Sequence, residues 1–173
     1  MSSGSGSTTA RRHARPATAL VSTVARLGLA GVFLVAGGLK VADPQAAVQA
    51  VRAYQLLPAS LEVPVGWALP FLEITIGLLL AVGLCTREAA AAAATLLVVF
   101  VVAVASAAAR GLAIDCGCFG GGGTVAPEDT EYAVEIVRDI ALLGLAAWLV
   151  WRPNSLLSLD PPSRHHDRMP LED

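Results

Sequence analysis

Four long apolar runs dominate the hydrophobic pattern of the chain. They cover about residues 20–41, 65–84, 89–109 and 132–151. Each has about 20 residues, enough for a helix to cross about 30 Å of hydrocarbon at about 1.5 Å per residue. Only helices or closed barrels satisfy the backbone in lipid, and these runs are too long for barrel strands. The pattern predicts an all-α fold, a bundle of four transmembrane helices.

A shorter amphipathic segment lies between the first two runs. Asp43 is suited to cap a helix, Pro44 is suited to the first helical position, and Pro58 ends the segment. The apolar residues that recur at helical spacing are Ala47, Val48, Val51, Tyr54 and Leu57. One apolar stripe on a short helix is typical of a helix that lies on the membrane surface. We therefore expect a short amphipathic interfacial helix here.

Composition agrees with a membrane protein that has polar ends. Hydrophobic residues make up 55% of the chain and charged residues only 15%, against about 25% charged in ordinary soluble proteins. The net charge of −2 gives no basis for a nucleic-acid partner. Residues 1–19 and 152–173 lack apolar periodicity, and we expect both to be flexible tails. The predicted organisation is one membrane domain, 20–151, between two tails.

Positive charges indicate the orientation, because cytoplasmic loops carry an excess of Lys and Arg. The charges assigned to the cytoplasmic side are Arg11, Arg12, Arg15, Arg26, Arg87, Arg152, Arg164 and Arg168. On the other side, acidic residues outnumber the basic ones. We therefore expect a multi-pass protein of the plasma membrane with both termini in the cytoplasm and the loop between the last two spans outside.

That loop contains two of the three cysteines of the chain, in Cys116-Gly117-Cys118-Phe119-Gly120. A disulfide between cysteines one residue apart closes a very small ring, and strained bridges exchange readily. An oxidising compartment allows such a bridge to persist. The glycines that follow, as far as Gly123, are expected to keep the pair open to a partner. Cys116 and Cys118 are the candidate catalytic residues.

Two other interpretations of the thiol pair stay open. The pair can be a purely structural bridge, or it can be half of a metal site shared with another chain. A complete zinc site within this chain is not expected, since structural zinc takes four ligands. His13, His165 and His166 lie in the tails, and Cys85 lies near the opposite end of the second span. No metal is predicted.

Charged residues within the spans form the second candidate feature. Glu73 lies about 12 Å into the second span and Arg138 about 10 Å into the fourth, at about 1.5 Å per residue. Similar depth predicts a Glu73–Arg138 pair, with Asp139 turned toward Lys40 or another polar group. Lys40 is expected to extend its ammonium to the membrane surface. Charges at such depth are functional candidates by default, and both a structural and a proton-handling role stay open.

Several short motifs, taken in order, resemble those of the MauE family. They are Gly37-Gly38-Leu39-Lys40, Asp43-Pro44, Tyr54 with Leu57-Pro58, Leu69-Pro70 with Glu73 and Gly77, Cys116-Gly117-Cys118-Phe119-Gly120, and Arg138-Asp139. This is the methylamine-utilisation membrane protein family, related in architecture to DoxX-like proteins. The resemblance covers about residues 20–151, and the Cys-Gly-Cys-Phe-Gly element is its most specific part.

The resemblance implies a four-span membrane protein of redox maturation outside the cytoplasm. The family's first member works beside a thioredoxin-like protein in producing the disulfide-rich small subunit of methylamine dehydrogenase. Carried over by position, the redox residues are Cys116 and Cys118, which would exchange with a thioredoxin-like extracytoplasmic partner. The chain would then be a component of a thiol–disulfide oxidoreductase system. The family name alone does not establish methylamine metabolism for this chain.

Three points are left open by the sequence. The chain can instead be a non-enzymatic membrane scaffold in which Cys116 and Cys118 form a structural bridge. It can also carry reducing equivalents outward, although such a relay needs a second thiol pair and only Cys85 remains. The cofactor is undetermined; a membrane quinone is one candidate, with no quinone motif in the sequence.

Overall fold

The computed structural model describes residues 16–118, 120–153, 155 and 159. Its elements in chain order are α1 (Pro16–Ala42), α2 (Pro44–Ala53), α3 (Ala59–Val82), α4 (Thr86–Ala109), β1 (Ile114–Asp115), β2 (Gly123–Thr124), a 3-10 turn (Pro127–Asp129) and α5 (Tyr132–Trp151). The prediction of an all-α protein is confirmed, with one very small antiparallel hairpin added. Most of the two predicted tails, and Phe119, lie outside the described residues.

Three of these helices, α1, α3 and α4, are long and apolar enough to cross a membrane. The fourth predicted span corresponds to α5, which has the predicted bounds and 20 residues. Its first half carries three charged residues, Glu135, Arg138 and Asp139, whereas each of the other three long helices carries two. The structure thus supports three spans, and a fourth is taken up below as a proposal.

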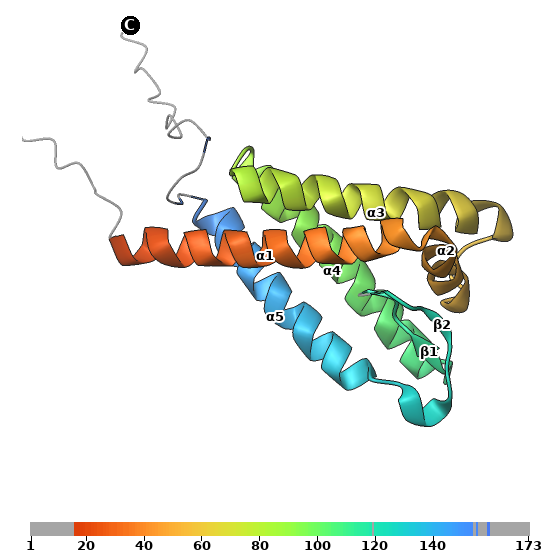
Figure 1. The fold of residues 1–173 in the computed structure, drawn as a ribbon. Coiled ribbons are helices and arrows are strands. Elements are labelled where there is room, and N and C mark those ends of the chain that lie inside the picture. Colours follow the sequence, from red (N-terminus) through yellow and green to blue (C-terminus); the bar gives the residue numbers. More distant parts are fainter. Residues whose placement is uncertain (1–15, 119, 154, 156–158, 160–173) are drawn as a thin grey trace, which may run out of the picture.

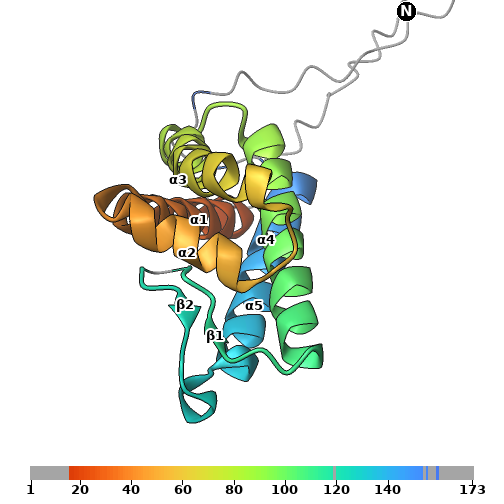
Figure 2. The ribbon, with the colours of Figure 1, turned by 90° about the vertical axis from the view of Figure 1, so that its right-hand side faces the viewer.

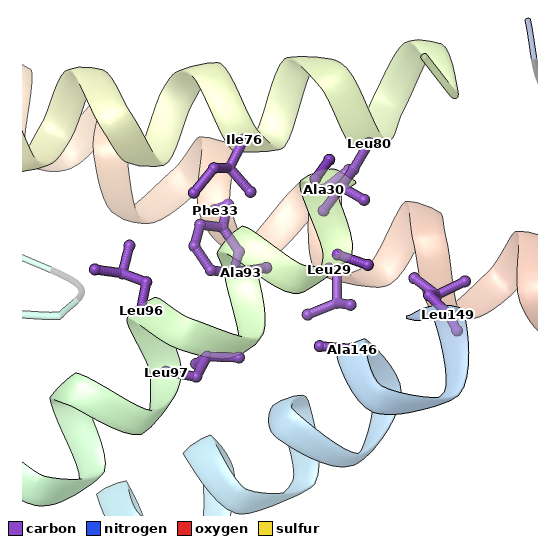
Figure 3. Packing of buried hydrophobic residues seen from close by; sticks show 13 residues of the cluster. Leu29, Ala30, Phe33, Ile76, Leu80, Ala93, Leu96, Leu97, Ala146 and Leu149 are labelled. Atoms are coloured by element: carbon purple, nitrogen blue, oxygen red, sulfur yellow. The ribbon is translucent and has the colours of Figure 1, made fainter. Parts of the chain in front are cut away.

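The long helices are arranged as two neighbouring pairs, α1 beside α3 and α4 beside α5 (Figure 1). The core between them is built from small and branched side chains of all four helices, among them Leu29, Leu80, Ala93 and Ala146 (Figure 3). In lipid, helices associate through such close packing because burial of apolar surface gives little advantage there. The core therefore fixes how the long helices sit against one another.

Gly37 marks the closest approach of α1 to α3. A Cβ at this position would lie 2.7 Å from Cγ1 of Ile74 and 2.9 Å from the backbone oxygen of Pro70. Both distances are shorter than a side chain tolerates, so only glycine fits here. Gly37 lies four residues before the end of the predicted first span. Its contact brings the end of α1 against α3, next to Glu73.

The connecting helix α2 begins as predicted. The Asp43 side chain accepts a hydrogen bond of 3.0 Å from the Ala46 amide, and Pro44 occupies the first helical position. The helix ends earlier than predicted, at Ala53, because Gln55 adopts a positive φ of 50°. Pro58 instead precedes α3, which begins at Ala59, before the predicted start of the second apolar run, so that Pro64 lies inside the helix.

Arg26 differs most from its predicted surroundings. It was grouped with the cytoplasmic positive charges, yet it is only 2% exposed. Its Nη1 donates to the carbonyl oxygens of Leu80 (2.6 Å) and Ala81 (3.0 Å) near the end of α3. Carbonyls in the last turn of a helix lack intrahelical partners and attract cations. Arg26 therefore binds the C-terminal end of α3 to α1.

Candidate thiol site

The two cysteines lie in the loop that joins α4 to α5, where the β1–β2 hairpin lies beside α2 (Figure 2). Ile114 pairs with Thr124, and Asp115 pairs with Gly123. The four consecutive glycines 120–123 all have a positive φ, a conformation that glycine adopts without strain. The hairpin folds the loop back over the cysteines.

Close contact with α2 explains the glycine between the cysteines. Gly117 has a φ of 67°, and a Cβ there would lie 2.6 Å from Cβ of Ala50. Gly122 approaches the same methyl group, where a Cβ would lie 2.5 Å away. Both glycines therefore let the loop rest directly on α2. This contact holds Cys116 and Cys118 against the helical domain.

The sulfur atoms are covered, contrary to the expectation of an open surface. Cys116 is 8% exposed and Cys118 is 9% exposed. Both are free thiols in the structure, which thus represents the reduced pair. They pack with Val104, Tyr54 and Ile136. A protein partner can reach the sulfur atoms only if this packing opens.

The two thiols are unequal in acidity. The Cys118 amide donates a 3.3 Å hydrogen bond to the Cys116 sulfur. A hydrogen bond from the Cys116 thiol lowers the pKa of Cys118, and the positive charges of Lys40 and Arg138 lower it further. The same shared proton, together with burial, raises the pKa of Cys116. Cys118 is therefore the more acidic thiol of the pair, although burial and Asp139 oppose the shift, and Cys116 is its hydrogen-bond donor.

Side chains from two helices hold the cysteine backbone in place. The Tyr54 hydroxyl, just after α2, donates to the Cys116 carbonyl at 3.5 Å. Lys40 Nζ, near the end of α1, donates to the Cys118 carbonyl at 3.2 Å. Burial raises the pKa of Tyr54, so its hydroxyl stays protonated and remains a donor. The pair is thus positioned by the helical domain rather than by its own short loop.

Lys40 also forms the main buried ion pair, and this corrects two predictions. Its ammonium lies 2.7 Å and 2.9 Å from the two carboxylate oxygens of Glu73. The Lys40 and Glu73 side chains are 6% and 1% exposed. Glu73 therefore pairs with Lys40 instead of Arg138, and Lys40 does not extend to the surface. The predicted pairing failed because depth along two helices does not tell which helix faces face each other.

Arg138 pairs with its own neighbour, Asp139, at 2.9 Å. Asp139 is 2% exposed, and its second oxygen, Oδ2, has no hydrogen-bond partner among the described residues. Glu73, Cys118, Arg138 and Asp139 together line a cavity of about 20 Å³. A water molecule needs about 10–15 Å³ and two to four polar partners, so this cavity is large enough for one. The four predicted polar residues are thus gathered around the thiol site, as two ion pairs.

Glu135 is a residue that the sequence analysis missed. It lies in the first turn of α5 and is 8% exposed. Ligand atoms of Asp115, Cys116 and Glu135 all lie within 4.8 Å of one another. These three donors fall one short of the four that structural zinc takes. The sequence signal that could have revealed Glu135 is its position three residues before Arg138, because this spacing puts both side chains on one helical face.

A larger cavity, of about 270 Å³, lies on the other side of the thiols. Residues of α2, α3 and α4 form its mostly apolar wall, including Ala50, Leu69 and Phe100. Its polar contributions come from Lys40, Tyr54 and the two cysteines. Cys118 and Phe100 line both cavities, so the large apolar space and the small one that contains Glu73, Arg138 and Asp139 adjoin at Cys118.

Cys85 takes no part in this site. It is exposed and immediately precedes α4, whereas Cys116 follows the other end of that helix. A helix of 24 residues spans about 36 Å at about 1.5 Å per residue. Direct exchange between Cys85 and the pair is excluded at that separation.

Comparison with known proteins gives one match. The family model described as methylamine utilisation protein MauE matches residues 18–152. No curated protein and no solved structure matches the chain. The matched segment includes every helix of the fold and the whole thiol site.

Proposed function

The chain belongs to the methylamine utilisation protein MauE family, and from that premise and the thiol geometry we propose that it exchanges disulfides with a thioredoxin-like protein outside the cytoplasm. It is a multi-pass membrane protein. The observation that carries the proposal is the buried Cys116–Cys118 pair, in which the Cys118 amide donates a 3.3 Å hydrogen bond to the Cys116 sulfur. The lowered pKa of Cys118 favours it as the leaving group. Low leaving-group pKa speeds thiol–disulfide exchange.

The proposed step begins with an oxidised Cys116–Cys118 bridge. A thiolate of the partner attacks the Cys116 sulfur, a new S–S bond forms, and Cys118 leaves as thiolate. The second thiol of the partner then attacks its own mixed disulfide and releases Cys116. The partner loses two electrons and becomes a disulfide, while the pair gains them and becomes a dithiol. Glu135 accepts or returns the proton of Cys116, because its carboxylate is buried beside that sulfur.

The same proposal includes the arrangement in the membrane. We place α5 across the bilayer as a fourth span, with Glu135, Arg138 and Asp139 facing the bundle where ion pairing lowers their cost. Both termini then lie on the same side, because the number of spans is even, and the excess of Lys and Arg next to the spans assigns that side to the cytoplasm. α2 lies at the outer interface, with Lys40 and the thiol loop on that side.

Mixed-disulfide trapping tests the exchange. In a Cys118→Ser variant, Cys116 can still attack an oxidised partner by the reverse of this step, and no Cys118 thiol remains to release that partner from the mixed disulfide. A Cys116→Ser variant removes the attacked sulfur and serves as the matched control. Both variants, in a Cys85→Ala background, would be isolated from intact cells by non-reducing electrophoresis after rapid acid quenching.

We expect an adduct of a thioredoxin-like protein with Cys118→Ser and much less with Cys116→Ser. The outcome that would overturn the proposal is full biological function in a Cys116→Ser, Cys118→Ser double variant without any adduct. That result would favour the non-enzymatic scaffold. Labelling by a membrane-impermeant maleimide only after mild reduction would show that the native pair is an outward-facing disulfide.

A further inference from the structure

The large cavity next to the thiols has the features of a ligand site. Both cysteines line it, and the remaining wall is almost entirely apolar. Sites for larger ligands measure about 300–1,000 Å³, so a space of about 270 Å³ suits a single substituted ring. We propose that this cavity binds the ring of a lipid-soluble quinone that accepts electrons from Cys116 and Cys118. The inference rests on the proposed function, because it supplies the step that regenerates the disulfide.

The residues that line the cavity indicate which class of electron acceptor it can bind. A nucleotide cofactor would bring phosphate charges against apolar side chains such as Leu69 and Phe100, which is costly without paired cations. The one nearby ammonium, Lys40, already directs three hydrogen bonds to Glu73 and the Cys118 carbonyl. An ammonium has three donors. An uncharged, largely apolar two-electron acceptor is the class that fits.

Tyr54 supplies a donor for a ring oxygen. Its hydroxyl lines the cavity, and its bond to the Cys116 carbonyl is long, at 3.5 Å. A small rotation would redirect this hydroxyl to a carbonyl of the bound ring. The positive charge of Lys40, at the same wall, favours the negative charge that develops on a ring oxygen as it is reduced. Tyr54 is thus a positioning residue for the acceptor.

The cavity reaches the lipid-facing surface. Val99 of α4 lines it and is 54% exposed, and Leu56 lines it and is 51% exposed. Both side chains lie where the bundle meets acyl chains in the proposed arrangement. A ring could therefore enter sideways from the bilayer while its isoprenoid tail stays in lipid, because the cavity has no room for the tail.

The electron balance is complete. The Cys118 thiolate adds to a ring carbon and forms an S–C bond. Cys116, as its proton leaves, attacks the Cys118 sulfur, so one S–S bond forms while the S–C bond breaks and its electron pair stays with the ring. The quinone thereby gains two electrons, and its two oxygens take up two protons, one from Cys116 and one from water in place of the proton that Cys118 had already lost. The products are one disulfide and one quinol. The small cavity with Glu73 and Asp139 lies on the opposite side of Cys118 and offers a place for a transient proton.

The test uses the full-length chain in lipid nanodiscs, with Cys85 replaced by Ala. The reduced protein would be mixed with decylubiquinone or menadione, and quinone absorbance and disulfide formation followed together. Ala103→Phe fills the cavity, while Ala105→Phe places the same side chain on an exposed position of the same helix. Val99→Trp at the rim, with exposed Val102→Trp as its control, is a second pair if Ala103→Phe fails to fold.

We expect the unmodified chain to form one quinol per disulfide, and Ala103→Phe or Val99→Trp to slow this by about tenfold or more, since misplaced reacting groups lose rate steeply. Tyr54→Phe should slow it by about 3–10-fold, the worth of one hydrogen bond. Both control variants should match the unmodified chain. Equal rates in Ala103→Phe and Ala105→Phe, or no quinone reduction at all, would overturn the inference.

A second measurement distinguishes failure of the quinone site from failure of the proposed thiol–disulfide exchange. Exchange of the pair with an oxidised thioredoxin-like protein would be measured on the same samples without quinone. If exchange persists and quinone reduction is absent, only the quinone site is wrong. If exchange is also absent, the proposed function fails, and the quinone site fails with it.

Discussion

At the scale of single residues, the thiol site depends on how one proton is shared. Cys116 and Cys118 are chemically identical in the sequence, and the fold makes them different. Cys118 lies near the positive charges of Lys40 and Arg138, whereas Cys116 lies beside Glu135. The local charges, together with the hydrogen bond between the thiols, decide which sulfur leaves and which is attacked.

This asymmetry predicts the pH dependence of alkylation. Cys118 has a lowered pKa, so its thiolate forms at a lower pH than that of an ordinary thiol, and its alkylation rate should level off at a lower pH. Cys116→Ala removes the donor, so the pKa of Cys118 should rise and its rate should again climb with pH. Iodoacetamide kinetics followed by peptide mass spectrometry would measure this. A Cys118 profile that Cys116→Ala leaves unchanged would contradict the shared proton.

Burial gives a second prediction at this scale. Cys116 and Cys118 are 8% and 9% exposed, whereas Cys85 is exposed. In detergent without a partner, a bulky maleimide should label Cys85 well before either member of the reduced pair. Replacing the glycine Gly122 by Ala would strain its positive φ and clash with Ala50, and so should loosen the loop and speed labelling of the pair. Labelling at the Cys85 rate without that change would show that the loop does not cover the sulfurs.

At the scale of elements, one glycine contact and one ion pair join α1 to α3 beside the thiol site, while Arg26 joins them at the other end. Gly37 allows the backbones to meet, and Lys40 bonds to Glu73 one turn farther along α1. Since Lys40 also holds the Cys118 carbonyl, the contact between these helices sets the position of the thiol loop.

The glycine contact can be tested with a neighbouring control. Gly37→Ala would place a methyl group 2.9 Å from the Pro70 carbonyl, and overpacking of this kind costs about 1–3 kcal/mol of unfolding free energy. Gly38→Ala meets nothing within 4 Å and should instead stabilise the helix by about 0.5–1 kcal/mol. Unfolding in mixed detergent micelles would measure both. Equal effects would mean that the close approach is absent.

The ion pair gives a prediction of the same kind. Lys40→Met leaves Glu73 buried without a cation, which costs about 3–5 kcal/mol of unfolding free energy. The double variant Lys40→Met, Glu73→Leu removes both charges and should regain most of that loss. The same micelle unfolding would compare them. A double variant as unstable as Lys40→Met alone would show that the charge of Glu73 is not the cause.

At the scale of the whole molecule, the long helices place all predicted site residues at one end of the domain. The four apolar runs, α2 and its cap were predictable, because periodicity and capping are local. Arg138 was assigned to Glu73 wrongly, and Glu135 was missed, because pairing depends on which helix faces meet. The cover over Cys116 was also unpredictable, since it depends on the loop folding back onto Ala50.

The orientation is tested by single cysteines in a Cys85→Ala, Cys116→Ser, Cys118→Ser background. Thr124→Cys, exposed in the hairpin, should react with an impermeant maleimide in intact cells. Arg87→Cys, at the start of α4, should react only after lysis. The two positions lie at opposite ends of α4, so they are on opposite sides of the membrane if α4 crosses it once. Reaction of both variants before lysis would contradict the membrane placement. Reaction of Arg87→Cys alone before lysis would mean that the orientation is the opposite of the proposed one.

The buried bond between Lys40 and Glu73 also constrains how the protein is made. The two residues are 33 positions apart, so Lys40 leaves the ribosome well before its counter-charge exists. Lys40 lies in the last turn of α1, where its side chain can reach the interface, but Glu73 lies near the middle of α3, where a charge costs about 2.5–3.5 kcal/mol on insertion. We therefore expect α3 to enter the bilayer against α1, so that Lys40 turns inward and offsets the buried carboxylate as it arrives. Biogenesis of this chain, like its chemistry, then depends on a lysine that the mature fold hides from solvent.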